Sequence, residues 1–366
     1  MTRSGAPPKA HHFIPVGHLA RFGESGRTQR DAKLWVFDKL TGRVRHAKAG
    51  RVATQNDLYT YRVPMFPPGI DGLDALAAAI SDAANRDWWV ETDKAEIEHR
   101  GVQALAALER MPAGTHRLTE SARVDMVAYV ALQLTQHPTM MRRRAAAAVE
   151  RFWTAAERLV SRDSPIASLF TGLGQGDSVL GLIPDQLSLA RELNYLSWSV
   201  VRWLDGPGLV LGDNAVVARY PDQPFAIGDA WTPGATFTVP ISPATAVFLG
   251  GFDPGLVLVE DRPADVARRE IPLLNTMSWI RAERHVFGLR CEDLEATRAA
   301  LGPFPARLAS PDQLTVRESV LPRYALDDSG ALEVIPPPST LEYDHQAAFR
   351  ERFARSGKSA VGRQRR

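Results

Sequence analysis

The chain has 366 residues, with 44 Lys and Arg against 42 Asp and Glu, and a net charge of +2. With 45% hydrophobic and 23% charged residues, the composition is that of a globular protein and excludes global disorder. The near-neutral charge gives no overall argument for nucleic-acid binding, and the single cysteine, Cys291, excludes an internal disulfide.

The sequence contains no membrane-spanning or export signal that we can recognise. No run of about eighteen apolar residues occurs, so we expect no membrane span. The opening MTRSGAPPKAHHFIP lacks the apolar segment of a signal peptide. We therefore expect a cytoplasmic protein without Sec-type export.

The first part of the chain predicts a β-hairpin region. Residues 1–10 are expected to form a flexible leader, followed by an extended segment at 11–15 and a short helix at 16–22. Aromatic and β-branched residues predict strands at 34–37 and 43–46, joined as a hairpin. A third strand is expected at 58–63.

Helical spacing of apolar residues begins near residue 72 and dominates the middle of the chain. It predicts helices over 72–84, 92–108, 119–137, 142–160 and 185–204, with a glycine-rich loop at 172–176. Thr92 is the expected N-cap of the second helix. Pro138 is expected to end or kink the third.

The C-terminal part returns to β-rich segments. Strands are expected at 209–213, 215–220, 235–242 and 245–251, followed by helices at 264–287 and 291–301. Pro240 and Pro243 are expected to fix a loop between two strands. Asn275 is expected to be buried and to hold a neighbouring loop through its side chain.

The order of these segments predicts an α+β fold, because two groups of strands flank a block of helices. It comprises an N-terminal β-hairpin region, a central helical block and C-terminal β segments with a packing helix. One globular domain is expected over 11–301, followed by a Pro-rich and basic tail over 302–366. Residues 350–366 hold seven Lys and Arg and one Glu. They predict a disordered arm and a candidate nucleic-acid contact.

The first group of chemically able residues is His11-His12-Phe13-Ile14-Pro15, with Asn56 further along. This opening resembles that of ββα-metal nucleases of the HNH type. In that type one His activates water, an Asn orients it, and another His binds a divalent metal. The rest of the motif does not follow, since no His occurs between Asn56 and His99. The alternative is that one His bonds local backbone and the other is a polar core contact.

The second group is Gly212-Asp213-Asn214, which follows an apolar segment. Asp and Asn suit a tight turn, because their side chains bond nearby backbone. At a strand end the same oxygen atoms also suit a metal ion or a substrate hydroxyl. Both interpretations stay open.

Together these segments resemble a family known as domain of unknown function 4238, over about residues 11–290. The resemblance is carried mainly by His11 to Pro15, Trp35 to Asp38, Asn56 to Tyr59, Gly212 to Asn214, and Asn275 with Ala282. Two positions depart from the family pattern: Val16 stands where a basic residue is usual, and Gly212 and Ala215 replace Ser and Pro around the Asp-Asn pair. The resemblance brings no established reaction. It implies that six residues belong to one architecture: His11, His12, Asn56, Tyr59, Asp213 and Asn214.

Two functions follow from these residues. The first is a metal-dependent hydrolase acting on phosphodiesters, with a divalent metal bound by His11, His12 and Asp213. Its catalytic residues would be His11, His12, Asn56, Asp213 and Asn214, and its metal ligands must lie within about 10 Å of one another. The second is a non-catalytic binding or regulatory protein whose polar motifs are structural. The sequence does not decide between an enzyme and a binding protein.

Overall fold

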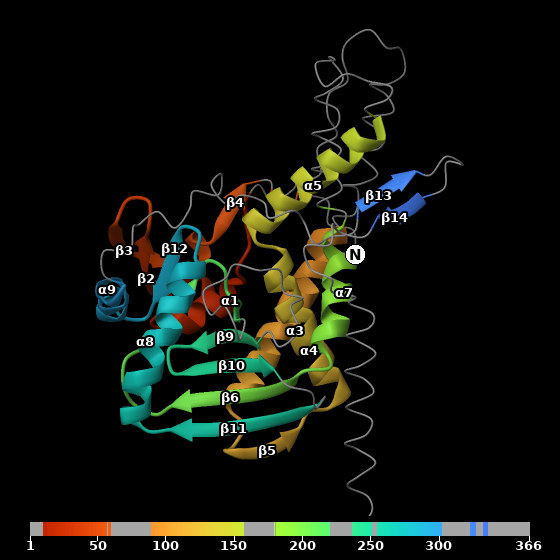
Figure 1. Cartoon of the computed structure of the whole chain (residues 1–366). Helices are drawn as coiled ribbons and strands as arrows, with labels where there is room; N and C mark the ends of the chain where they lie inside the picture. Colours follow the sequence, from red (N-terminus) through yellow and green to blue (C-terminus); the bar gives the residue numbers. More distant parts are fainter. Residues whose placement is uncertain are drawn as a thin grey trace, which may run out of the picture.

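The computed structural model is an α+β fold in which helices cover a large sheet and a smaller one (Figure 1). It describes residues 10–56, 58–59, 89–156, 179, 181–219, 236–250, 255–301, 323–326 and 332–335. Labels follow Figure 1.

The large sheet has six strands in the order β5-β11-β6-β10-β9-β8. β11 runs parallel to β6, and the other neighbouring pairs are antiparallel. In sheet order the strands are β5 (Gly114–Arg117), β11 (Leu256–Arg262), β6 (Ser197–Trp203), β10 (Thr245–Gly250), β9 (Thr236–Ser242) and β8 (Val217–Arg219).

The smaller sheet joins strands from the N-terminal and C-terminal halves of the chain, in the order β3-β2-β12-β7. Its strands are β3 (Arg43–Lys48), β2 (Lys33–Asp38), β12 (His285–Gly288) and β7 (Leu211–Gly212). β2 pairs with β12 across some 250 positions of sequence, for example Trp35 with Gly288. The predicted N-terminal hairpin is therefore confirmed, and C-terminal strands extend it into one sheet.

Two short strand pairs complete the β structure. β1 (Ala10–His12) pairs antiparallel with β4 (Thr54–Asn56). β13 (Arg323–Leu326) and β14 (Leu332–Ile335) form a hairpin within the segment predicted to be a tail.

Seven α-helices surround the sheets in the described part of the chain. They are α1 (Val16–Leu19), α3 (Trp89–Glu109), α4 (Glu120–Thr135), α5 (Pro138–Ala156), α7 (Leu182–Leu193), α8 (Ala264–Arg281) and α9 (Cys291–Ala300). Three 3-10 turns are η1 (Ala20–Phe22), η2 (Gln29–Asp31) and η3 (Ala49–Arg51). None of these helices combines the length and apolarity needed to cross a bilayer.

One core lies between the large sheet and the helices α3, α4 and α7 (Figure 1). It is built from apolar side chains that recur at helical spacing and on one face of each strand, among them Leu105, Met126, Leu189, Val200 and Val247. The helical block predicted from this spacing is thus explained by burial of one apolar face of each helix.

Helix boundaries match the sequence where a local signal sets them. The Thr119 hydroxyl caps α4 by accepting from the Ala122 N–H at 3.3 Å. Pro138 begins α5 after α4 has ended at Thr135, as expected for a proline at a first helical position. The predicted N-cap at Thr92 is wrong, because α3 already begins at Trp89.

Two predicted helices extend beyond the ends of the helices in the structure. The helix predicted over 185–204 ends as α7 at Leu193, and β6 follows between β10 and β11. The helix predicted over 264–287 ends as α8 at Arg281, and β12 follows. In both cases, pairing with distant strands overrides a local apolar spacing that also fits a helix.

The loop predicted from Pro240 and Pro243 is confirmed at Pro243, between the two predicted strands, but not at Pro240. Pro240 lies inside β9, and the turn to β10 occupies residues 243–244. The pairing of β9 with β10 shifts register beside Ala246, which is the partner of Pro240. Such an irregularity lets a strand contain a residue that has no N–H to donate.

Asn275 is buried as predicted and holds a neighbouring segment. Its side-chain oxygen accepts from the Val210 N–H, and its amide nitrogen donates to the Gly208 carbonyl, both at 2.9 Å. This segment leads into β7.

Several predictions fall outside the described residues. They concern the leader up to residue 9, the strand at 60–63, the helix at 72–84, the loop at 172–176 and the basic arm at 350–366. The two described residues of the third predicted strand, 58–59, form a turn.

A buried histidine, His18, links α1 to the large sheet and to α4. Its Nε2 lies 2.7 Å from the Pro240 carbonyl oxygen, and its Nδ1 lies 2.7 Å from the Tyr129 hydroxyl. A carbonyl only accepts hydrogen bonds, so Nε2 carries the proton and Nδ1 accepts from Tyr129. Burial lowers the pKa of His18 to about 4, so the imidazole is neutral at pH 7.

Gly101 allows α3 to approach Tyr129 closely. A Cβ built on Gly101 would lie 2.2 Å from Cδ2 of the Tyr129 ring. No side chain fits there without moving the ring away from His18.

Gly101→Ala should therefore destabilise the protein by about 2 kcal/mol, although the same change in an open helix stabilises by about 1 kcal/mol. Urea unfolding of the variant measures the sign. Ala107→Gly, at an exposed position of α3, gives the ordinary helix-propensity effect. A Gly101→Ala protein more stable than the parent would contradict this packing.

His18 should make stability depend on pH in a defined window. Because its pKa is about 4 in the fold and about 6.5 when unfolded, the unfolded chain takes up a proton first as the pH falls. Stability should fall by about 3 kcal/mol between pH 6.5 and pH 4. Urea unfolding of parent and His18→Gln at several pH values isolates this part of the slope, which the variant should lack; equal slopes would contradict it.

Candidate functional site

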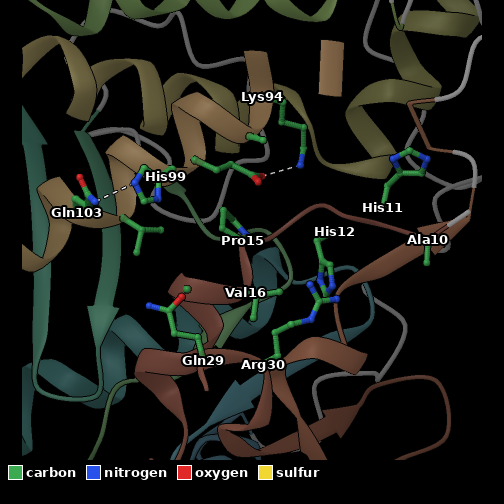
Figure 2. Close-up of a pocket in the computed structure, with 14 residues that line it drawn as sticks. Ala10, His11, His12, Pro15, Val16, Gln29, Arg30, Lys94, His99 and Gln103 are labelled. Carbon is green, nitrogen blue, oxygen red and sulfur yellow. Dashed lines mark hydrogen bonds and ion pairs between the residues drawn. The ribbon is translucent and has the colours of Figure 1, made fainter. Parts of the chain in front are cut away.

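The described residues form a cavity of about 680 Å³ between β1, the start of α1, η2 and the first half of α3 (Figure 2). Six of its lining residues are ionisable: His11, His12, Arg30, Lys94, Glu98 and His99. Two of the predicted site residues, His11 and His12, therefore lie at one cavity.

The two histidines have different surroundings, because neighbouring residues of a strand point in opposite directions. His11 is 3% exposed, and its ring meets the Tyr59 ring edge-on, with centroids 5.4 Å apart. His12 is half-buried and lies opposite Thr54 of β4. His12 is therefore the more accessible of the pair, and His11 is part of the cavity's supporting wall.

Arg30 lies on the same side of the cavity as His12 in Figure 2. It belongs to η2 and is exposed, and no described residue forms a hydrogen bond or ion pair with its side chain. Its backbone and side chain pack against Gly50 of η3, where a Cβ would come within 3.1 Å of the Arg30 Cβ. Arg30 is thus a guanidinium held near the cavity mouth.

Helix α3 supplies the opposite wall with a buried cation. Lys94 is only 2% exposed, and its Nζ lies 2.8 Å from Glu98 Oε1, one helical turn away. The same nitrogen lies 4.9 Å from the centre of the Tyr59 ring. A buried ammonium needs such partners, because leaving water is otherwise too costly.

His99 lies one position after Glu98, towards Gln103 (Figure 2). The Gln103 side-chain nitrogen donates to His99 Nε2 at 3.0 Å. A neutral His99 with this acceptor carries its proton on Nδ1. The lining thus combines one carboxylate with one ammonium, one guanidinium and three imidazoles, which favours an anionic ligand.

Asp213 lies in different surroundings and is not among the residues that line this cavity. Its two carboxylate oxygens accept from three successive backbone N–H groups, those of Glu283, Arg284 and His285, at 2.7, 2.8 and 2.7 Å. Its own N–H donates to the His285 carbonyl at 2.9 Å. The carboxylate therefore fixes the connection between α8 and β12.

Three further charged or titratable groups surround Asp213. His137 Nε2 lies 4.0 Å from Asp213 Oδ1 and 3.8 Å from Glu283 Oε2. Lys39 Nζ donates to the carbonyls of Trp279 and Ala282 at the end of α8, at 2.9 and 2.5 Å. Burial lowers the pKa of Lys39, while the nearby Asp213 and Glu283 oppose that shift. The Lys39 ammonium suits this helix end, where carbonyls lack partners.

The predicted site residues thus divide into two groups. His11 and His12 line the cavity, and Asn56 lies in β4 opposite Ala10, itself a lining residue. Asp213 and Asn214 belong to the turn after β7. Among the described residues, no group of three or more His, Cys, Asp or Glu side chains is suited to hold a metal ion. The described donors therefore do not support the predicted metal set of His11, His12 and Asp213.

Sequence reasoning missed Arg30 and Lys94. In sequence, Lys94 and Glu98 form an ordinary i,i+4 pair of a surface helix. Nothing local indicates that Lys94 is buried beneath Tyr59, because that depends on how α3 packs against β1 and the turn at residues 58–59.

A family model described as a protein of unknown function (DUF4238) matches residues 10–290. The chain belongs to this family. The match covers every residue of the cavity and the Asp213 turn, and it confirms the resemblance found in the sequence. No curated protein and no solved structure matches this DUF4238 member.

Asp213→Ala should destabilise this DUF4238 protein by about 3 kcal/mol, because three partly buried N–H donors lose their acceptor. Chemical unfolding measures the loss, and the neighbouring change Asn214→Ala, expected within about 1 kcal/mol of the parent, is the control. An Asp213→Ala protein of unchanged stability would contradict the structural role.

Proposed function

We propose that this DUF4238 protein hydrolyses phosphodiesters in the cavity between β1, η2 and α3, with His12 as the acid–base group. The supporting observation is the placement of a half-buried imidazole, His12, in a cavity that also holds Arg30 and Lys94. An imidazole titrates near neutral pH, and such cations stabilise negative charge on phosphate.

In the proposed reaction, His12 removes a proton from water as the water oxygen bonds to phosphorus. The bond from phosphorus to the leaving oxygen breaks, and that oxygen takes a proton from solvent in the open cavity. Arg30 and Lys94 stabilise the charge that develops on the phosphoryl oxygens. The buried Lys94–Glu98 pair keeps the ammonium oriented, and His11 fixes β1 through its contact with Tyr59.

No step of this reaction uses a metal ion, because the described donors do not form a metal site. The proposal therefore keeps the phosphodiester substrate expected from the sequence and changes the catalytic groups. Asp213 and Asn214 have no role in the proposed reaction, since neither lines the cavity. Both carboxylate oxygens of Asp213 also accept hydrogen bonds from backbone N–H groups. Cytoplasmic location remains part of the proposal.

A non-catalytic binding role is the second candidate function. It is favoured by Asp213 and Asn275, whose side chains both bond backbone groups in the way expected of structural residues. Under this alternative the cavity holds an anionic ligand without converting it.

The test is hydrolysis of bis(p-nitrophenyl) phosphate by purified full-length protein across pH 5–9. His12→Ala should reduce the rate by about 100-fold or more, since a general base contributes at least that factor. His116→Ala, in β5 and outside the cavity, should leave the rate unchanged.

The outcomes separate the two functions. A rate that survives His12→Ala assigns the activity elsewhere and overturns the proposed mechanism. An absence of hydrolysis, together with binding of inorganic phosphate or a nucleotide that Arg30→Gln weakens, would favour the binding role.

A further inference from the structure

Positive charge is concentrated in two segments of the chain: residues 350–366, with a net charge of +6, and residues 24–51, which lie within the described part of the fold. Residues 24–51 contain eight Lys and Arg and three Asp and Glu, a net charge of +5, whereas the whole chain carries +2. The remaining residues therefore carry −3 in sum. This segment comprises η2, the β2–β3 hairpin and η3.

The carboxylates of this segment do not neutralise most of its cations. Asp31 pairs with Lys48 at 2.8 Å, and Asp38 pairs with Arg284, outside the segment, at 2.9 Å. Six exposed cations form no side-chain hydrogen bond or ion pair with a described residue: Arg27, Arg30, Lys33, Arg43, Arg45 and Arg51. We call these six residues the basic hairpin surface.

The basic hairpin surface begins at the cavity and extends away from it. Arg30 lines the cavity, and its side chain packs on Gly50 of η3, next to Arg51. From there β3 runs along the edge of the small sheet (Figure 1). Within β3, Arg45 and then Arg43 lie progressively closer to the hairpin turn at residues 39–42. Six residues of strand span about 20 Å, which is long enough to contact several phosphates of an extended chain.

An aromatic pair lies on the same hairpin, on the face that Lys33 shares and opposite to the face of Arg43 and Arg45, because side chains alternate along a strand. Trp35 of β2 stacks on His46 of β3, with ring centroids 4.8 Å apart and an angle of 25° between the rings. His46 is exposed and Trp35 is half-buried. Surfaces that bind single strands combine cations for the backbone with aromatic rings on which bases stack.

Cations on an edge strand also have a simpler role, since they discourage pairing with other molecules. That role accounts for Arg43 and Arg45 on β3. It does not account for Arg27, Arg30 and Arg51, which lie in 3-10 turns and a loop outside the strand. The continuation of charge from the edge to the cavity is what favours a ligand.

We propose that the basic hairpin surface binds single-stranded nucleic acid and directs one of its phosphodiesters to the cavity. The catalytic half of this statement rests on the proposed function, whereas the binding half does not. It also differs from the sequence expectation, which assigned nucleic-acid contact to the basic tail.

The test measures fluorescence anisotropy of labelled 12-nucleotide RNA and DNA strands with full-length protein between 50 and 200 mM salt. The triple variant Arg43→Gln/Arg45→Gln/Arg51→Gln should bind at least about 10-fold more weakly. Its slope of log affinity against log salt should be smaller by about 2, since each phosphate contact in single strands contributes about 0.7.

The matched control removes three exposed arginines elsewhere, Arg110→Gln/Arg117→Gln/Arg268→Gln, and should keep the parent slope. These residues lie after α3, in β5 and in α8, and like the test residues they form no side-chain ion pair with a described residue. A third variant, in which every Lys and Arg of residues 350–366 is replaced by Gln, measures the tail. Circular dichroism checks that each variant is folded.

Equal weakening in the test and control triples, or weakening only in the tail variant, would overturn the hairpin proposal. An unchanged hairpin variant beside a His12-dependent hydrolase would overturn it while leaving the proposed function intact. Loss of binding in the hairpin variant without any hydrolysis would support the surface and contradict the enzyme. A higher affinity of the parent protein for RNA or for DNA then identifies which nucleic acid the basic hairpin surface binds.

Discussion

The corner between α4 and α5, at residues 136–137, contacts both the N-terminal segment around Phe13 and the turn at Asp213. The side-chain amide of Gln136 donates to the Phe13 carbonyl at 2.8 Å, and its backbone carbonyl accepts from the Tyr59 hydroxyl at 3.2 Å. The next residue, His137, packs edge-on against the Phe13 ring and lies 4.0 Å from Asp213. Segments that resemble the family in sequence therefore meet at this corner. Because each contact involves a buried polar group, losing one leaves its partner unsatisfied.

The same region contains Asp213, a residue predicted from the sequence to be catalytic, whose carboxylate bonds backbone groups in the structure. Asp213 resembles a metal ligand in sequence, but its oxygens replace the backbone partners that the α8–β12 connection lacks. Asn275 does the same for the segment before β7. Polar residues with acceptors and donors in fixed directions are needed wherever irregular backbone is buried. Their chemical ability alone is therefore a weak guide to catalysis.

The sequence predicted elements wherever the deciding signal was local. Thr119 and Pro138 set helix ends through groups within a few residues, and the β2–β3 hairpin follows from adjacent patterns. β6 and β12 were missed because they become strands only by pairing with segments far away in the chain. The cavity shows the same limit: the His pair was found from its motif, whereas Arg30 and Lys94 join it only through folding.

The cavity's chemistry depends on the same corner. Lys94 is stable in its buried position because the Tyr59 ring and Glu98 partner it, and Tyr59 is held in turn by Gln136. The carboxylate of Glu98 also acts on the neighbouring Tyr129, whose hydroxyl bonds the neutral His18. An anionic ligand that draws the ammonium away from Glu98 would leave that carboxylate less compensated beside an apolar core. The cavity wall formed by Lys94 is thus built into the core, while His12 and Arg30, on the opposite side, are the more exposed groups.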